Sequence, residues 1–349
     1  MKTIFSKLIL VCIAIVLMTS CNNKKGKTNL IPIRIGWQIP LATQGQVVQV
    51  MKNTNVLELN ELKGNFISFS YGGPQSEAAL AGELDVIFIG DQPAVNLISK
   101  GGKWKIVSRL FYTKTAIMVS LNSEIKSIAD LKGKTVATPF GSVAHREAIL
   151  KQQSAGLDAD KDVNNINLDI LEISNIVQTG DKTRWGNIDA VGVWEPSTSL
   201  FELKKLAKIV DFTKTLGVVA ISEDFINKHP KETVKFLISL VESWYYFSAN
   251  QNKVNKWYID DAKLPYSSEL LKAASSIDPN INAKNINDID LSISQDNINT
   301  LGIAAKWAYE RKFVKSTAII SNAVDLSFLN KATATIKKDG FDINKIIHK

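Results

Sequence analysis

Two segments of the chain share a ten-residue pattern, and this repeat restricts the possible folds more than any other feature. Residues 82–91 align with residues 186–195, a shift of 186 − 82 = 104 positions. Each segment reads as a helix end, a glycine, an apolar strand and an acidic residue just beyond the strand. Ligands of open α/β sheets bind in the crevice beyond the carboxyl ends of the strands. The repeat therefore predicts two similar lobes whose loops face one another across a cleft.

Strand and helix patterns alternate along the first part of the chain. This order predicts an α/β fold with mostly parallel sheets. From Glu232 onward the pattern becomes strongly helical. A length of 349 residues suffices for about two domains, but no Pro- or Gly-rich linker separates them. Strands are expected at residues 31–36, 66–71, 84–89, 105–111 and 116–120, and C-terminal helices at 233–247, 268–277, 297–310 and 327–336.

Composition argues against several classes of function. A hydrophobic content of 45% with 22% charged residues is typical of a globular protein. The 42 Lys+Arg against 34 Asp+Glu at first suggest a nucleic-acid binder. Two of these lysines lie in residues 1–20 and three in residues 21–29, so the rest carries only 37 − 34 = +3, too little to indicate nucleic-acid binding. Three histidines and two cysteines without metal-ligand spacing predict no metal site, and we expect no cofactor.

The N-terminus resembles an export signal. Residues 1–7 carry two lysines and no acid, and the apolar run that follows is shorter than the roughly 20 residues of a membrane span. Residues 17–21 resemble a bacterial lipoprotein box. We therefore expect removal of residues 1–20, lipidation of Cys21, a polar tether over residues 21–29, and a protein exported and lipid-anchored to the bacterial cell membrane. The alternative is a plain secretory signal or an uncleaved anchor.

A turn between an expected strand and helix carries candidate binding residues. Residues 135–145 read as a strand, a Pro/Gly turn and a helix start with Ser142 as the N-cap. Unpaired N–H groups and the dipole at a helix N-terminus attract sulfonate, phosphate, nitrate or carboxylate groups, and Gly141 would let them approach the backbone. His145, one turn into the helix, points either into the cleft or onto the neighbouring strand. The alternative interpretation is an ordinary helix cap with no ligand.

Polar and aromatic residues follow three other expected strands. Trp194 would form an apolar wall, and Glu195 would accept hydrogen bonds from an amine or a ring nitrogen. Asp91 and Gln92 follow the equivalent strand of the first repeat, and Gln38 follows the first strand of the chain. Each has a second interpretation, with Trp194 in the core, Glu195 solvated, and Asp91 and Gln92 as helix caps.

Signatures of catalysis are absent from the sequence. It contains no Gly-x-Ser-x-Gly elbow, no P-loop and no convincing nucleotide fingerprint. Loss of Cys12 with the signal and lipidation of Cys21 would leave no thiol in the mature protein. We therefore expect that the protein is not an enzyme.

Four motifs, in order, resemble the solute-binding proteins of ABC importers for nitrate, sulfonates and taurine. They occupy residues 72–93, 128–136, 141–145 and 188–196 within a similarity that covers about residues 30–250. The motifs do not separate the sulfonate, nitrate and thiamine-pyrimidine branches of this superfamily. The resemblance implies a two-lobed periplasmic-binding-protein fold of the second type, with a mixed, mostly parallel sheet in each lobe and a hinge between them.

The resemblance also implies how the chain is divided and what it binds to. Residues 30–115 and 217–349 would form lobe 1 together with the C-terminal helices, and residues 116–216 would form lobe 2. The lobes would close on the solute by a hinge motion that shields it from water. The expected partners are an ABC permease with its ATPase, and we expect the chain itself to be a monomer.

The family's binding positions map onto residues of both lobes. Gln38, Asp91 and Gln92 would line the wall of lobe 1. The wall of lobe 2 would comprise Gly141, Ser142, His145, Trp194 and Glu195. Because an unpaired buried charge is costly, Glu195 disfavours a bare anion and favours a taurine-like sulfonate with its amine near this carboxylate and its anionic head near Ser142. The alternatives are a thiamine-pyrimidine precursor, nitrate or bicarbonate, an exported enzyme on the same fold, or an adhesin without a closed cleft.

Overall fold

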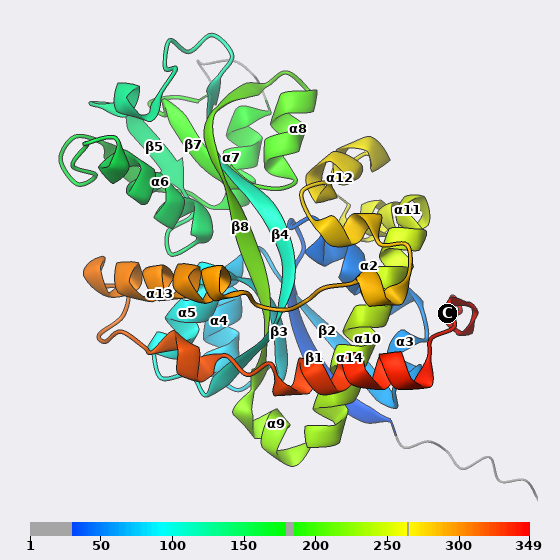
Figure 1. Ribbon diagram of the computed structural model, residues 1–349. Coiled ribbons are helices and arrows are strands. Elements are labelled where there is room, and N and C mark those ends of the chain that lie inside the picture. The colour runs from blue at the N-terminus through cyan, green and yellow to red at the C-terminus, as the bar shows by residue number, and fades with distance from the viewer. Residues whose placement is uncertain (1–29, 179–184, 264) are drawn as a thin grey trace, which may run out of the picture. The chain divides into compact units, whose positions relative to one another are not determined.

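The computed structural model describes residues 30–178, 185–263 and 265–349, so the expected signal peptide, Cys21 and the tether lie outside the described residues. In these parts of the chain, eight strands form one sheet in the order β2-β1-β3-β8-β4-β7-β5-β6 (Figure 1). The α/β class is therefore confirmed. The strands are β1 (Ile31–Gln38), β2 (Leu62–Phe69), β3 (Val86–Gly90), β4 (Trp104–Ser120), β5 (Thr135–Thr138), β6 (Asn164–Asn167), β7 (Ala190–Trp194) and β8 (Ala207–Ser222).

Two long antiparallel strands connect the two ends of this sheet. Strands β4 and β8, of 17 and 16 residues, pair along almost their whole length (Figure 1). At one end, β3 pairs with residues 217–221 of β8, and at the other end β7 pairs with residues 115–119 of β4. The pairings of β1 with β2 and β3, and of β5 with β6 and β7, are parallel. The sheet is therefore mixed, with a parallel group at each end of the crossing pair.

The crossing pair differs from what the sequence predicted. The sequence indicated two strands over residues 105–111 and 116–120, where the structure has the single strand β4. The polar residues between them, such as Lys114, remain extended because β8 supplies a continuous hydrogen-bonding partner. Strand β8 itself was not predicted, because its first half is polar and only partly buried.

The helices flank the sheet and fill the C-terminal part of the chain. The four predicted C-terminal helices are present as α10, α12, α13 and α14. Among the residues that the structure describes, no helix is long and apolar enough to span a membrane. The helices are α2 (Gln44–Asn53), α3 (Val56–Leu59), α4 (Gly72–Leu80), α5 (Asp91–Ser99), α6 (Val143–Ser154), α7 (Ile170–Val177), α8 (Ser197–Leu203), α9 (Glu223–Lys228), α10 (Pro230–Ala249), α11 (Gln251–Ala262), α12 (Ser268–Ser275), α13 (Gln295–Glu310) and α14 (Ser327–Asp339), with short 3-10 turns that include η3 (Pro279–Asn282).

Helix α11 was not predicted, because its sequence is polar. It is held by the packing of Tyr258, which is fully buried against α2. Gly45 on α2 makes this contact possible, since a Cβ at this position would lie 2.3 Å from the Tyr258 ring. Tertiary contact has therefore overridden weak local propensity.

Glu242 on α10 is a half-buried carboxyl group at the contact with α3. It accepts a hydrogen bond from Asn60 Nδ2 at 2.8 Å. Burial raises the pKa of Glu242 to about 7 from its ordinary 4.5, and the bond from Asn60 offsets only part of this shift. Because the folded protein holds this proton more tightly than the unfolded chain does, folding stability falls as the pH rises from 4.5 to 7.

The substitution Glu242→Gln removes this titration and retains an oxygen that accepts from Asn60. We expect it to raise the free energy of unfolding by about 1–2 kcal/mol at pH 8 and to change it little at pH 5. Urea-induced unfolding at the two pH values measures the difference. An equal effect at both values would contradict a titrating Glu242.

Candidate functional site

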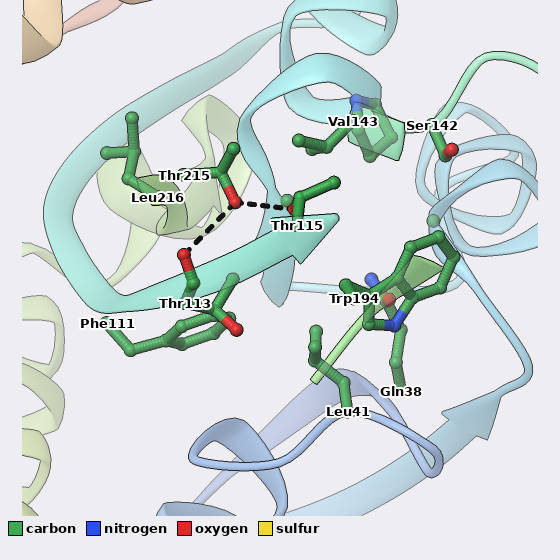
Figure 2. A pocket seen from close by; sticks show the side chains of 13 residues that line it. Gln38, Leu41, Phe111, Thr113, Thr115, Ser142, Val143, Trp194, Thr215 and Leu216 are labelled. Atoms are coloured by element: carbon green, nitrogen blue, oxygen red, sulfur yellow. Dashed lines mark hydrogen bonds between the residues drawn. The ribbon is translucent and has the colours of Figure 1, made fainter. Parts of the chain in front are cut away.

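A cavity lies at the carboxyl ends of the parallel strands, where the repeat had predicted a cleft. Its empty space, including the part open to solvent, is about 400 Å³. Residues from both ends of the sheet line it, as do the crossing strands (Figure 2). The lining residues are Gln38, Leu41, Gly72, Gly90, Pro93, Phe111, Thr113, Thr115, Ser142, Val143, Trp194, Thr215 and Leu216.

Three helices begin at this cavity. Helix α4 begins at the lining residue Gly72, and α5 begins directly after Gly90. Helix α6 begins at Val143, with Ser142 as its N-cap. A helix N-terminus presents unpaired N–H groups and the positive end of the helix dipole. None of the residues that line the cavity carries a charge, and the N–H groups of these helix ends favour an anionic group.

Threonine hydroxyls from the crossing strands add polar groups to the cavity. Thr215 Oγ1 lies 2.8 Å from Thr115 Oγ1 and donates to the carbonyl of Thr113 at 3.4 Å (Figure 2). The Thr113 hydroxyl and the Trp194 Nε1 are buried and have no hydrogen-bond partner within the described part of the chain. Both residues line the cavity, so these two groups are available as hydrogen-bond donors on its wall.

The remaining wall of the cavity is apolar. Leu41, Phe111, Leu216 and the indole of Trp194 provide hydrocarbon surface. Gly217 allows the Phe111 ring to take its place, because a Cβ on Gly217 would lie 2.5 Å from that ring. The cavity therefore combines neutral hydrogen-bond donors with an apolar wall.

The threonines and most of this apolar wall were not predicted from the sequence. Thr113 and Thr115 alternate along β4, so both point to one face of the strand. That alternation is the signal that the sequence offered. It was not decisive, because the fold had to bring Thr215 opposite Thr113.

Three of the eight predicted binding residues line the cavity, namely Gln38, Ser142 and Trp194. Gln38 Nε2 donates to Gln75 Oε1 at 2.9 Å, which fixes its amide at the end of β1. Ser142 Oγ accepts from the backbone N–H of His145 at 3.3 Å, as an N-cap does. For these three residues, ligand binding stays a prediction.

Asp91 and Gln92 do not line the cavity. Both are fully buried in the first turn of α5 and contact Arg146 on α6. Arg146 Nη2 donates to Asp91 Oδ2 at 2.9 Å, and Gln92 Nε2 donates to Asn96 Oδ1 at 2.8 Å. Their polar atoms are thus engaged within the protein, although the two residues stand between the lining residues Gly90 and Pro93.

His145 and Gly141 lie beside the cavity rather than in its lining. The His145 ring stacks on Phe140 at 4.1 Å and meets the edges of Trp307 and Phe313. Its Nδ1 accepts a hydrogen bond from the N–H of Gly141, whose φ of 74° is a conformation that favours glycine. Burial lowers the pKa of His145 to about 4, so the ring is neutral at physiological pH.

Glu195, between β7 and α8, contacts the first turn of α8 instead of lining the cavity. Its two oxygens accept from the hydroxyl and the N–H of Ser199 at 2.9 and 3.1 Å, and Lys114 Nζ lies 3.4 Å from Oε1. Burial alone would lower the pKa of Lys114, but Glu195 and Glu202 together raise it. The carboxylate is therefore already paired, and Glu195, predicted from the sequence to accept from an amine of the solute, does not line the cavity.

The described residues contain no group of three or more His, Cys, Asp or Glu side chains that could hold a metal ion. The polar atoms at the cavity are hydroxyls, amides and an indole N–H. Such a set suits an oxyanion rather than a cation.

Comparison with known proteins identifies the relatives of the chain. Residues 94–254 match the protein family described as NMT1/THI5 like. A Bacillus subtilis (strain 168) protein named for binding aliphatic sulfonates is 26% identical over 338 residues, which cover 93% of this chain and 96% of that protein. Over almost its whole length, the chain is thus similar to a protein named for binding a solute. An Escherichia coli (strain K12) protein with the same name is 30% identical over 169 residues, 47% of this chain and 49% of its own length.

Solved structures share the fold at low sequence identity. The alkanesulfonate-binding protein SsuA from Xanthomonas axonopodis pv. citri, bound to MOPS, has a TM-score of 0.68 at 19% identity and covers 84% of this chain and 98% of its own. The periplasmic nitrate-binding protein NrtA from Synechocystis PCC 6803 has a TM-score of 0.68 at 12% identity, over 91% of both chains. The desulfurization enzyme DSZB has a TM-score of 0.62 at 11% identity, over 87% and 99%. The two-lobed periplasmic-binding-protein fold is therefore confirmed.

Proposed function

We propose that the chain captures a small organic sulfonate in this cavity and delivers it to the permease of an ABC importer. The observation that carries the proposal is the convergence of three helix N-termini on a cavity lined by no charged residue. Neutral donors suit a weakly basic oxyanion whose charge is spread over several oxygens. Names of the sequence relatives support the same class of solute.

The apolar wall indicates the rest of the solute. Leu41, Phe111 and Leu216 offer hydrocarbon surface next to the donors, which fits a short alkyl chain on the sulfonate. Nitrate has no group to fill this wall. Taurine would place an ammonium group in a cavity with no carboxylate in its lining, because Glu195 is paired elsewhere. We therefore favour an alkanesulfonate over the taurine-like zwitterion that the sequence suggested.

The binding role is favoured over an exported enzyme. One structural neighbour is an enzyme, and a solved structure of it is a Cys-to-Ser mutant in complex with biphenyl-2-sulfinic acid. The present chain has no cysteine beyond Cys21. It therefore has no thiol at the cavity, whereas its sequence relatives are named as binding proteins.

The proposal includes the lobes, the anchor and the partners. Lobe 1 would comprise residues 30–115 and 217–349 and lobe 2 residues 116–216, joined by the crossing pair β4 and β8. Export and lipidation at Cys21 would tether the protein, as a monomer, beside a permease and its ATPase. A tethered receptor stays close to the permease without any enzymatic turnover.

A thermal-shift panel with butanesulfonate, taurine, nitrate and hydroxymethylpyrimidine tests the proposed function. A solute at 100 times its dissociation constant stabilises the folded state by about 2.7 kcal/mol. We expect butanesulfonate to give the largest shift. A larger shift with taurine or nitrate would contradict the assignment of the apolar wall, and a shift with hydroxymethylpyrimidine alone would overturn the sulfonate class.

The unpaired indole N–H gives a sharper test by calorimetric titration. Trp194→Phe removes this donor and retains an aromatic wall. We expect butanesulfonate affinity to fall roughly 10- to 100-fold, the range for a hydrogen bond to a charged group. Trp185→Phe is the matched control, because Trp185 Nε1 is also buried and unpaired among the described residues but does not line the cavity. Equal losses in the two variants would exclude a role for the Trp194 donor.

A further inference from the structure

Asp91 and Arg146 form a fully buried ion pair between α5 and α6. Arg146 Nη2 lies 2.9 Å from Asp91 Oδ2, and the two side chains are 1% and 0% exposed. Arg146 Nη1 also donates to Gln92 Oε1 at 3.3 Å. The second carboxylate at Arg146 is Glu147, its neighbour on the same helix, at 3.0 Å. Asp91 and Gln92 are therefore the side chains by which α5 holds this arginine.

The two helices belong to opposite ends of the sheet. Helix α5 follows β3, which pairs with β8 at one end of the crossing strands. Helix α6 follows β5, which reaches the other end of the crossing strands through β7. The pair therefore spans the division between the two lobes rather than stabilising either lobe internally.

The ion pair lies directly behind the cavity. Four lining residues of the cavity flank the pair. They are Gly90 and Pro93 at the start of α5, and Ser142 and Val143 at the start of α6. Gly90 and Val143 meet closely, since a Cβ on Gly90 would lie 3.2 Å from a Val143 methyl carbon. The two walls of the cavity thus meet beside Asp91 and one helical turn from Arg146.

Neighbouring contacts across the same division support the closed arrangement. Asn96 Nδ2 on α5 donates to the carbonyl of Gly141 at 3.3 Å. Helix α13 lies along α5 (Figure 1), and its Trp307 meets the ring of His145 on α6. Arg311, at the end of α13, makes two 2.6 Å hydrogen bonds to Asp160.

We propose that Asp91 and Arg146 are positioning residues for solute capture, forming a latch that holds the two cavity walls together when the lobes close. The inference rests on the proposed function, because it assumes that the lobes separate to admit a solute. In the open arrangement both charges would reach water, so the pair would form only on closure. Charged side chains also keep these surfaces soluble while they are exposed, whereas a hydrophobic contact would leave an apolar patch on the open protein.

The latch predicts different effects on solute affinity and on the stability of the solute-free protein. In Asp91→Asn, Arg146 keeps only the carboxylate of Glu147 on its own helix, so the closed state loses the ion pair that joins α5 to α6. We expect Asp91→Asn to weaken butanesulfonate binding roughly 10- to 100-fold in calorimetric titration. The solute-free protein should keep its thermal unfolding midpoint, because the open form hydrates Arg146. Arg146→Gln is expected to behave in the same way.

Two matched variants complete the design. Glu147→Gln removes the other carboxylate at Arg146 and leaves the latch, so affinity should stay within about threefold of the wild type, the ordinary effect of a partly exposed pair. Asp278→Asn disrupts a second fully buried pair, with Arg109, and should lower the unfolding midpoint even without solute.

The latch is contradicted if Asp91→Asn lowers the unfolding midpoint of the solute-free protein as much as Asp278→Asn does. The latch is also contradicted if Asp91→Asn tightens butanesulfonate binding, because the freed Arg146 would then be a ligand. If the wild type binds no sulfonate, the proposed function fails, and the solute-free midpoints alone decide the latch.

Discussion

Replacing Asp278 with alanine is expected to lower the free energy of unfolding by about 3–5 kcal/mol, the range for breaking a buried ion pair. Asp278 is fully buried, and its Oδ2 accepts from Arg109 Nη1 and from the backbone N–H of Tyr112, both at 2.6 Å. Its Oδ1 accepts from the N–H of Asn280 at 2.9 Å. The variant would leave the Arg109 guanidinium, only 2% exposed, without its carboxylate.

Asp278 holds the C-terminal helical segment on the crossing strand β4. The β4–β8 register shifts between Arg109 and Phe111, and Trp244 Nε1 donates to the carbonyl of Leu110 within this irregular stretch at 2.9 Å. Phe111 lines the cavity. A loss of Asp278 should therefore also disturb the cavity wall.

Urea-induced unfolding measures the loss in Asp278→Ala. The control is Asp260→Ala on α11, where both partners of the Lys256–Asp260 pair are largely exposed, and we expect a change within about 0.5 kcal/mol. Adding Arg109→Met to Asp278→Ala should restore part of the stability, because it removes the unpaired charge. A loss below about 1 kcal/mol in Asp278→Ala would contradict a stabilising role for the pair.

The second large effect is a loss of stability on acidification that depends on His145. Burial is the main cause that lowers its pKa to about 4, the positive charge of Arg311 lowers it further, and Asp160 opposes the shift. Between pH 6.5 and pH 4 the unfolded chain binds a proton at His145 and the folded protein does not. The free energy of unfolding is therefore highest, as far as His145 is concerned, above pH 6.5, and it declines as the pH falls towards 4. We expect it to be about 2 kcal/mol lower at pH 5 than at pH 7.

His145→Phe tests this pH dependence, because it retains a ring to stack on Phe140 and removes the titration. We expect the free energy of unfolding to fall less between pH 7 and pH 5 in the variant than in the wild type, by about 2 kcal/mol. His348→Phe, at an exposed ring stacked on Trp257, is the control and should keep the wild-type difference. An unchanged pH dependence in His145→Phe would show that the folded ring titrates as an unfolded one does.

The repeat and the alternating pattern predicted the α/β class and the position of the cavity at the strand ends. Both follow from local periodicity, which decides where a segment becomes strand or helix. Strand β8 and helix α11 could not be found in this way, because their polar residues are held in place by partners remote in the sequence. The division into lobes and the lipid anchor stay predictions.

For the site, the sequence alone determined which residues stand at the strand ends, and the tertiary structure decided what each side chain contacts. Ser142 and Trp194 line the cavity, as their places after β5 and at the end of β7 suggested. Asp91 and Glu195 hold equivalent places in the repeat, yet Arg146 pairs with the first and Ser199 and Lys114 with the second. Backbone periodicity is a short-range property of neighbouring residues. The pairing of a buried charge depends instead on which oppositely charged group the completed fold brings within a few ångströms.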